Sequence, residues 1–196
     1  MYERYFKRVF DVVLATIGLI VLFPFLLIIS MWIKVSSKGP LFYTQKRVGL
    51  NFKEFDIYKF RSMVVNAQGP SVTSADDPRI TKIGRFLRRS KIDELPQLLN
   101  VLKGDMSLVG PRPEVMKFVD TKRDAYKKVL RVRPGITDNA AIAFRDEEKI
   151  MSQYEDKEKA YVDIVLPQKI ALYYKYVESV SFTNDIKLIL QTLKVI

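Results

Sequence analysis

Residues 9–33 read VFDVVLATIGLIVLFPFLLIISMWI and place the strongest constraint on the fold of this chain. This stretch contains a single charge, Asp11, and as a helix it would be roughly 37 Å long. That length is enough to cross a hydrocarbon core of about 30 Å. A cleavable signal peptide has a shorter apolar region that ends in a small-residue cleavage site, which residues 34–37 do not supply. We therefore expect this segment to lie in lipid.

Pro24 lies near the middle of this segment, where it removes a helical hydrogen bond and predicts a kink. Basic residues flank both ends of the segment: Arg4, Lys7, Arg8, Lys34 and Lys38. Because positive flanks favour the cytoplasm, the pattern indicates a helix that enters one leaflet, breaks at Pro24 and returns. A single span with a mild kink is the alternative. Asp11 follows Lys7 by four residues, so we expect the two to form an ion pair.

The composition narrows the chemistry that this chain can perform. Its 196 residues include 33 Lys+Arg and 22 Asp+Glu, which gives a net charge of +11, and there is no His and no Cys. A Ser-His-Asp triad, a cysteine nucleophile, a disulfide framework and a zinc site of the usual type are therefore excluded. The positive charge indicates an anionic partner, either nucleic acid, anionic lipid or a phosphorylated substrate.

The remaining sequence predicts an α+β fold that is mostly helical. Residues 40–45 and 53–61 have strand character, with Gly49 and Asn51 between them, and together predict a small β-hairpin. Residues 66–78 have the composition of a loop. Helices are expected over residues 79–89, 95–103, 147–164, 167–177 and 184–195, with Asn184 capping the last and Gly104 ending the second.

The helix expected over residues 79–89 is amphipathic, with Arg and Lys on one face and Ile, Phe and Leu on the other. Such a helix can lie at a membrane interface or line a phosphate pocket. A solvated charged face over a core stripe is the ordinary alternative. Just beyond it, Asp93 and Glu94 form an acidic pair at the start of the next helix. Such a pair can hold Mg²⁺, supply a nucleophile, or simply favour the helix N-terminus.

A second candidate lies at Arg112, which stands between Pro111 and Pro113. The two prolines fix the backbone, so the guanidinium fork can bind phosphate at small entropic cost. Another stiff basic turn over residues 131–137 contains Arg133. A surface turn is the alternative for either segment.

Four blocks of the sequence, taken in order, carry a resemblance: KFRSM at 59–63, SKIDELPQ at 90–97, NVLKGDMSLVGPRP at 100–113 and RPGIT at 133–137. They look like the successive motifs of the bacterial sugar transferases, which are monotopic phosphoglycosyl transferases. The similarity runs from about residue 1 to the C-terminus. Since no further apolar segment precedes Met1, the chain resembles the minimal catalytic form of that family. Two departures are Phe23, where members usually have Ser before the proline, and residues 138–147, where many members read Gly-Trp-Ala-Gln-Val-Asn-Gly-Arg.

The resemblance implies transfer of a sugar 1-phosphate from a UDP-sugar to undecaprenyl or another polyprenyl phosphate, with release of UMP. The reaction would initiate surface-glycan or glycoprotein-glycan synthesis at the cytoplasmic face of the bacterial inner membrane. By the same resemblance, Asp93 would form a covalent phospho-sugar intermediate in a ping-pong route. Glu94 would bind Mg²⁺ together with Asp93, and Arg112 would hold phosphate. Further substrate-binding candidates are Lys59, Arg88, Arg133 and Arg145, with Lys7 and Arg8 as weaker ones.

On this interpretation the chain has two parts, a re-entrant membrane helix over residues 1–35 and a cytoplasmic, membrane-associated catalytic domain over 36–196. The expected partners are a UDP-sugar, a polyprenyl phosphate and the lipid bilayer, and a homo-oligomer is compatible with the sequence. We expect no nucleic-acid partner because no nucleic-acid-reading motif is present. The alternative function is a non-catalytic, membrane-anchored basic scaffold or adapter, but that gives no reason for the acidic pair beside a basic face.

Overall fold

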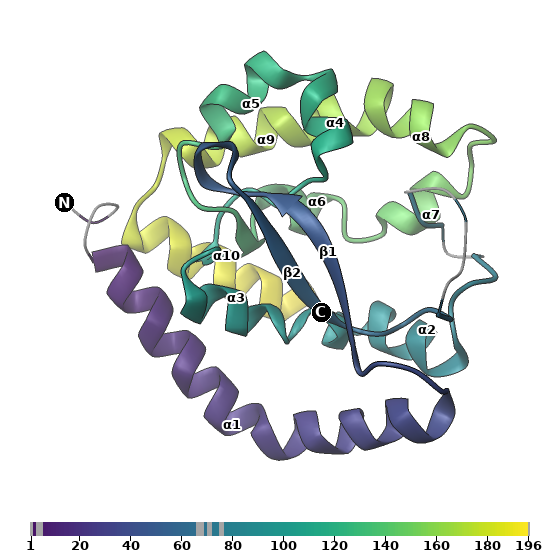
Figure 1. The fold of residues 1–196 in the computed structure, drawn as a ribbon. Helices are drawn as coiled ribbons and strands as arrows, with labels where there is room; N and C mark the ends of the chain where they lie inside the picture. The colour runs from purple at the N-terminus through teal and green to yellow at the C-terminus, as the bar shows by residue number, and fades with distance from the viewer. Residues whose placement is uncertain (1, 3–5, 66–68, 70–71, 75–76, 196) are drawn as a thin grey trace.

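The computed structural model describes residues 2, 6–65, 69, 72–74 and 77–195. Figure 1 shows the long helix α1 (Lys7–Ser36) along one side of the molecule and α9 (Leu166–Glu178) near the opposite side. The hairpin of β1 (Phe42–Val48) and β2 (Glu54–Phe60) crosses the space between them. The fold is mostly helical, as predicted. The other elements are η2 (Leu50–Phe52), α2 (Lys82–Arg89), η3 (Ile92–Glu94), α3 (Gln97–Lys103), β3 (Ser107–Val109), α4 (Met116–Thr121), α5 (Arg123–Val129), β4 (Gly135–Thr137), α6 (Asn139–Ala143), α7 (Glu147–Met151), α8 (Lys157–Ala160), η4 (Tyr161–Val165) and α10 (Phe182–Val195).

The apolar stretch forms one helix that contains Pro24 and continues through it. Figure 1 shows this helix curving about halfway along its length. The expectation of a helix broken at Pro24 is therefore wrong in one respect, because the helix is continuous through the proline. The buried residues of α1 form two sets, Lys7, Asp11 and Ala15 near its start and Ile29 and Ile33 near its end. Within each set the residues are four positions apart, so they lie on one face of the helix.

The two ends of α1 pack against the same body of the protein. Ala15 belongs to a buried cluster with Phe55 of β2 and Val101 of α3. Ile33, in the other half, belongs to a cluster with Phe60 at the end of β2. Because β2 contributes to both clusters, the two halves of α1 lie against one domain, and Figure 1 shows the helix curving between them.

The middle of α1 leaves its apolar side chains uncovered. Ile20 and Val21 are 69% and 67% exposed, although Ile and Val side chains are among those most often buried. Among the described residues, α1 is the one helix long and apolar enough to cross a membrane. Its most apolar 18-residue window has a mean hydropathy of 3.0, and 11% of that window is buried. A continuous apolar surface of this kind marks an interaction with lipid or another apolar partner.

The predicted ion pair between Lys7 and Asp11 is wrong. Lys7 Nζ lies 2.5 Å from Asp185 Oδ2 on α10, and both side chains are buried. Asp11 Oδ1 accepts a hydrogen bond from the backbone N–H of Leu108, at 3.0 Å, in β3. Helix neighbours pair in this way when they face solvent, whereas here α10 and β3 pack on the helix and supply buried partners instead.

The hairpin is confirmed, with β1 and β2 antiparallel and Phe42 opposite Phe60. Its turn uses left-handed backbone at Asn51 and Phe52, whose φ angles are 53° and 63°. A second, parallel pair of short strands, β3 and β4, joins Ser107–Val109 to Gly135–Thr137. This pair was not predicted, because three-residue strands have too little periodicity to be recognised in a sequence.

Several helix boundaries differ from those expected. The helix predicted over 147–164 divides into α7, α8 and the π-helical turn η4, and η4 runs directly into α9. Asn184 lies inside α10 and donates to the carbonyl of Ser179. The helix expected from residue 79 begins at Lys82, because Thr81 caps it. Gly104 ends α3 with a φ of 90°, as predicted. Of the loop expected over 66–78, residues 66–68, 70–71 and 75–76 lie outside the described residues, and the others are in neither helix nor strand.

Candidate active site

Asp93 and Glu94 lie in the short 3₁₀ turn η3, between the end of α2 and the start of α3. The sequence predicts instead that the two acidic residues lie in the first turn of the following helix. The turn is entered through Lys91, whose φ of 56° is left-handed and reverses the chain after α2. Both carboxylates are buried, with 5% of Asp93 and 9% of Glu94 exposed. Two adjacent buried carboxylates are costly unless cations compensate them, so their partners define the chemistry here.

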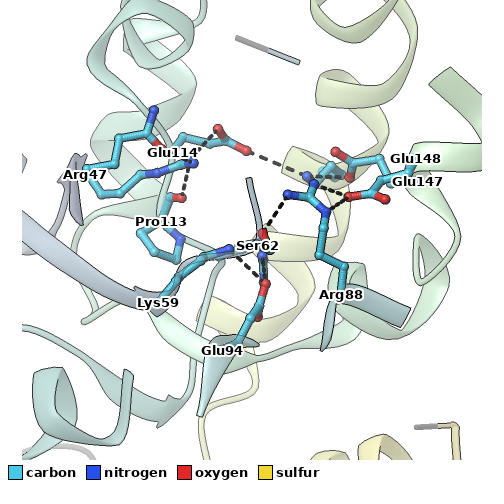
Figure 2. Close-up of polar contacts among 12 residues, drawn as sticks. Arg47, Lys59, Ser62, Arg88, Glu94, Pro113, Glu114, Glu147 and Glu148 are labelled. Atoms are coloured by element: carbon cyan, nitrogen blue, oxygen red, sulfur yellow. Dashed lines mark hydrogen bonds and ion pairs between the residues drawn. The ribbon is translucent and has the colours of Figure 1, made fainter. Parts of the chain in front are cut away.

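Glu94 is held by two cations that come from different parts of the chain. Lys59 Nζ of β2 lies 2.9 Å from Glu94 Oε1. Arg112 Nη1 donates to Glu94 Oε2 at 3.0 Å, and Arg112 Nη2 donates to Glu94 Oε1. Arg112 follows β3 in the Pro-Arg-Pro segment, so three predicted site residues, separated by up to 53 positions, meet at one carboxylate. Figure 2 shows Lys59 and Glu94 pointing toward each other.

Asp93 differs from Glu94 because no ion pair joins its carboxylate to a cation among the described residues. Its Oδ1 atom is buried and has no hydrogen-bond partner within the described part of the chain. Burial, reinforced by the charge of Glu94, raises the pKa of Asp93 to about 6, against the opposing influence of Lys59, Arg88 and Lys91. One oxygen of the Asp93 carboxylate has no partner among the described residues.

The pKa of Glu94 moves in the opposite direction. Burial alone would raise it, but the charges of Arg112 and Lys59 and their hydrogen bonds hold it well below its usual range. The neighbouring cations respond accordingly: the pKa of Arg112 is raised, mainly by Glu94, and burial lowers the pKa of Lys59. Adjacent carboxylates whose environments separate their pKa values typically have different chemical roles.

Arg88, at the end of α2, lies on a neighbouring part of the site. Its Nε donates to Glu148 Oε1 at 2.9 Å, and its Nη1 lies 3.4 Å from Ser62 Oγ. Figure 2 shows Arg88 pointing toward Glu147 and Glu148. Arg88 and Arg112 are thus both paired with glutamates in this structure.

The other predicted substrate-binding residues lie elsewhere. Arg133 Nε donates to the carbonyl of Gly104 at 2.9 Å, beyond the C-terminal end of α3 and therefore at the opposite end of that helix from the acidic pair. Arg8 donates to the carbonyls of Val101 and Leu102, at 2.5 and 2.9 Å, in the same last turn. The structure brings neither guanidinium to Glu94. Arg145 is half-buried in the segment between α6 and α7.

A buried charge network beside the site was missed from the sequence. Lys169 of α9, 2% exposed, donates to Glu147 Oε2 at 2.8 Å and lies 3.6 Å from Glu114 Oε1. Glu114 also accepts hydrogen bonds from Tyr161 and, at 3.5 Å, from Arg47. Its pKa is lowered because Lys169 and Arg47 outweigh the effect of burial. Spacing alone gives no signal for such a network, since its members come from β1 and from segments 67 to 122 residues further along.

The donor set fits a hard divalent cation that takes most of its ligands from water and substrate. The described residues contain no cluster of three or more metal-ligating side chains, so a cage made only of protein ligands is absent there. Mg²⁺ commonly uses one or two carboxylates together with substrate phosphates. The unpartnered Oδ1 of Asp93 is an oxygen of that kind, whereas both oxygens of Glu94 are already paired with Lys59 and Arg112.

Comparison with known proteins places this site in a family. The family model described as bacterial sugar transferase matches residues 2–196. The UDP-glucose:undecaprenyl-phosphate glucose-1-phosphate transferase of Escherichia coli (strain K12) is 38% identical over 196 residues, which is 97% of this chain and 40% of that protein. The enzyme of the same name from Caulobacter vibrioides is 39% identical over 191 residues, covering 95% of this chain and 67% of that protein.

A putative undecaprenyl-phosphate N-acetylgalactosaminyl 1-phosphate transferase of Bacillus subtilis (strain 168) is 50% identical over 116 residues, which is 58% of this chain and 65% of that protein. The chain therefore spans about two fifths of the length of the Escherichia coli relative and about two thirds of the other two. The family match extends over the long helix, the hairpin and the carboxylate pair alike. The chain belongs to the bacterial sugar transferase family.

Proposed function

We propose that this protein transfers a sugar 1-phosphate from a UDP-sugar to undecaprenyl phosphate and releases UMP, initiating glycan assembly at the membrane. The observation that carries the proposal is the buried Oδ1 of Asp93, a carboxylate oxygen without a hydrogen-bond partner among the described residues, next to a glutamate held by two cations. The names of the relatives state undecaprenyl-phosphate sugar transfer for those proteins and support the same reaction here.

The first step is attack by an Asp93 carboxylate oxygen on the phosphorus that bears the sugar. The bond from that phosphorus to the bridging oxygen breaks, UMP leaves with that oxygen, and the sugar phosphate is joined to Asp93. In the second step a phosphate oxygen of the lipid attacks the same phosphorus. The bond to Asp93 breaks, the carboxylate is restored, and the sugar is now carried on polyprenyl diphosphate.

The cations around the pair would stabilise the charge that moves during both steps. Arg112 presents two N–H groups in a fork, the geometry that matches two phosphate oxygens, and Lys59 adds a point charge. Arg88 would add a second fork from α2. A bound Mg²⁺, held by Asp93 and Glu94, would supply charge neutralisation on the diphosphate. Preorganised cations of this kind account for much of the barrier lowering in phosphoryl transfer.

The membrane part of the proposal is that α1 is re-entrant and that the catalytic domain lies on the cytoplasmic face. Both ends of α1 pack on one domain, which a straight crossing of the bilayer would prevent. Trp32 of α1 and Phe86 of α2 are each 49% exposed, and their ring centroids lie 5.8 Å apart. Aromatic side chains favour the membrane interface, so this pair would hold α2, and the carboxylates that follow it, at the height of the lipid phosphate.

The test is UMP release from a panel of UDP-sugars by the protein in nanodiscs, with and without undecaprenyl phosphate and Mg²⁺. A ping-pong route predicts that UMP formed without acceptor stops at one equivalent per enzyme, with a sugar-phosphate adduct located on Asp93 by mass spectrometry. Adding acceptor should restore turnover, and Asp93→Asn should release no UMP. UMP release by Asp93→Asn at the rate of the parent would refute the nucleophile. No UMP from any donor would favour the scaffold alternative.

A further inference from the structure

Arg112 lies in a segment whose backbone has one hydrogen-bond donor. Pro111 and Pro113 have no backbone N–H, so the amide of Arg112 is the single donor among these three residues. That amide donates to Asp138 Oδ2 at 3.0 Å. Asp138 is 1% exposed and comes from the start of α6, 26 residues further along the chain. The buried carboxylate of Asp138 therefore accepts a hydrogen bond from the only backbone N–H group of the Pro-Arg-Pro segment.

The backbone groups around Arg112 are satisfied by other parts of the fold. Gly110 donates to the carbonyl of Thr137 at 3.0 Å, and Pro111 accepts from the amide of Gly135 at 3.0 Å. On the other side, the carbonyl of Pro113 accepts from Arg47 Nη1 at 3.2 Å. Asp138 accepts the hydrogen bond from the backbone amide of Arg112, and the side chain of Arg112 donates to Glu94.

The second oxygen of Asp138 has a separate role. Asp138 Oδ1 accepts from the amide of Ala141 at 2.5 Å and so caps α6. The carboxylate thus divides between two amides, one that begins a helix and one that fixes Arg112. A side chain with a single acceptor oxygen cannot repeat this arrangement, in which each amide bonds a different oxygen.

We propose that Asp138 is a positioning residue for Arg112: its Oδ2 fixes the Arg112 backbone so that the guanidinium fork is held at the donor-phosphate site. The proposal rests on the function proposed above in one respect, that Arg112 binds phosphate. Hydrogen bonds to an ionised acceptor are shorter and stronger than neutral ones. A small displacement of a substrate-binding fork can cost about 100-fold in rate, so loss of this anchor has a measurable effect.

The first experiment compares hydrogen exchange at the Arg112 amide in the parent and in Asp138→Asn, both in nanodiscs. Asn has one oxygen and one NH₂ group in place of two oxygens, so it removes the negative charge and one of the two acceptors. Asp156→Asn is the matched control, because Asp156 caps α8 through the Lys159 amide at 3.0 Å and does not contact Arg112. We expect exchange at Arg112 to be about 10-fold faster or more in Asp138→Asn and unchanged in Asp156→Asn. Equal protection in all three proteins would overturn the proposal.

The second experiment is a double-mutant cycle on kcat/KM for UMP release, using Asp138→Asn, Arg112→Gln and the combined variant. If Asp138 acts through Arg112, Asp138→Asn lowers kcat/KM by about 10- to 100-fold in the parent and by less than about 2-fold in the Arg112→Gln background. A merely structural role for Asp138 would give the same loss in both backgrounds and would overturn the proposal. Thermal midpoints confirm that each variant is folded.

The two experiments separate failure of this inference from failure of the proposed function. A parent that releases no UMP from any donor contradicts the function, while exchange at Arg112 still decides whether Asp138 anchors the segment. An active parent whose Asp138→Asn variant keeps its exchange protection contradicts the inference alone. Where Arg112→Gln is too slow for the cycle, the exchange result decides.

Discussion

Arg112 and Glu94 form a two-point ion pair in which a guanidinium fork closes on the carboxylate next to Asp93 in the sequence. Arg112 Nη1 lies 3.0 Å from Glu94 Oε2, and Arg112 Nη2 and Lys59 Nζ both donate to Oε1. The pair keeps Glu94 ionised and leaves burial to dominate at Asp93. One carboxylate is thereby committed to cations while the other retains an unbonded oxygen.

Replacing Arg112 by lysine should lower kcat/KM by about 100-fold, because one ammonium cannot reproduce two parallel N–H contacts. Steady-state UMP release in nanodiscs measures the effect. Arg123→Lys is the control, since Arg123 is 57% exposed and pairs with the exposed Asp120 one turn away, an interaction of little energetic consequence. Equal activity of Arg112→Lys and the parent would contradict a role for the fork.

Asp93→Asn should abolish UMP release and also stabilise the protein above pH 6. In the parent, the folded state binds more protons at Asp93 than the unfolded state between about pH 4 and pH 6, because the folded pKa is raised to about 6. The free energy of unfolding of the parent therefore falls as pH rises through this range. Asp93→Asn has no ionisable group at this position, so its free energy of unfolding does not fall for this reason. The gain should be on the order of 2 kcal/mol at pH 7.5, a few degrees in Tm, and should vanish below about pH 4.

Thermal melts of the parent and Asp93→Asn in detergent at several pH values measure this difference. Asp138 also has a pKa raised to about 6 by burial, but it is present in both proteins and cancels in the comparison. A Tm difference that is the same at pH 4 and pH 7.5 would argue against the raised pKa. In the parent, UMP formation should rise with pH through about 6, as Asp93 ionises.

Gly84→Ala should destabilise the protein by about 2 kcal/mol or more. A Cβ atom at Gly84 would lie 1.9 Å from the carbonyl oxygen of Ser62, so α2 would have to move away from the segment that follows β2. Arg88 would move with α2, and activity should fall as well. The control is Gly18→Ala, whose Cβ meets Leu98 at an ordinary 3.5 Å and which should leave Tm unchanged or higher. Similar Tm values for the two variants would contradict the close packing.

Cysteine labelling tests the path of α1, because the chain has no native Cys. Phe6→Cys and Val35→Cys place single thiols at exposed positions near the two ends of the helix, and Ser152→Cys reports the side of the catalytic domain. A re-entrant helix predicts that an impermeant maleimide labels all three variants from the same side of sealed vesicles. Labelling of Phe6→Cys and Val35→Cys from opposite sides would show a crossing helix.

Local pattern was sufficient for part of the fold. The hairpin, the end of α3 at Gly104 and the apolar helix follow from residues close together in the sequence, because periodicity and turn chemistry act over short distances. The division of the expected 147–164 helix into α7, α8 and η4 did not follow from that local pattern. The parallel pairing of β3 with β4 also escaped prediction, since it joins segments almost thirty residues apart.

The candidate site divides in the same way. Asp93, Glu94 and Arg112 were indicated by short motifs, and the structure brings all three together with Lys59. Arg133 belongs to an equally distinctive motif, yet its side chain bonds to the far end of α3. A motif fixes the residue types and the local backbone, whereas the direction of a side chain depends on what packs around it.

The sequence by itself determined that residues 9–33 must leave water, that a basic surface accompanies them, and that an acidic pair lies near a rigid arginine. These properties come from composition and spacing, which need no knowledge of distant contacts. Only the tertiary structure decided that both ends of α1 rest on one domain, that Lys7 pairs with Asp185, and that Asp138 holds the amide of Arg112. Those contacts join residues tens to hundreds of positions apart, and burial in a shared core, which no local pattern encodes, selects each partner.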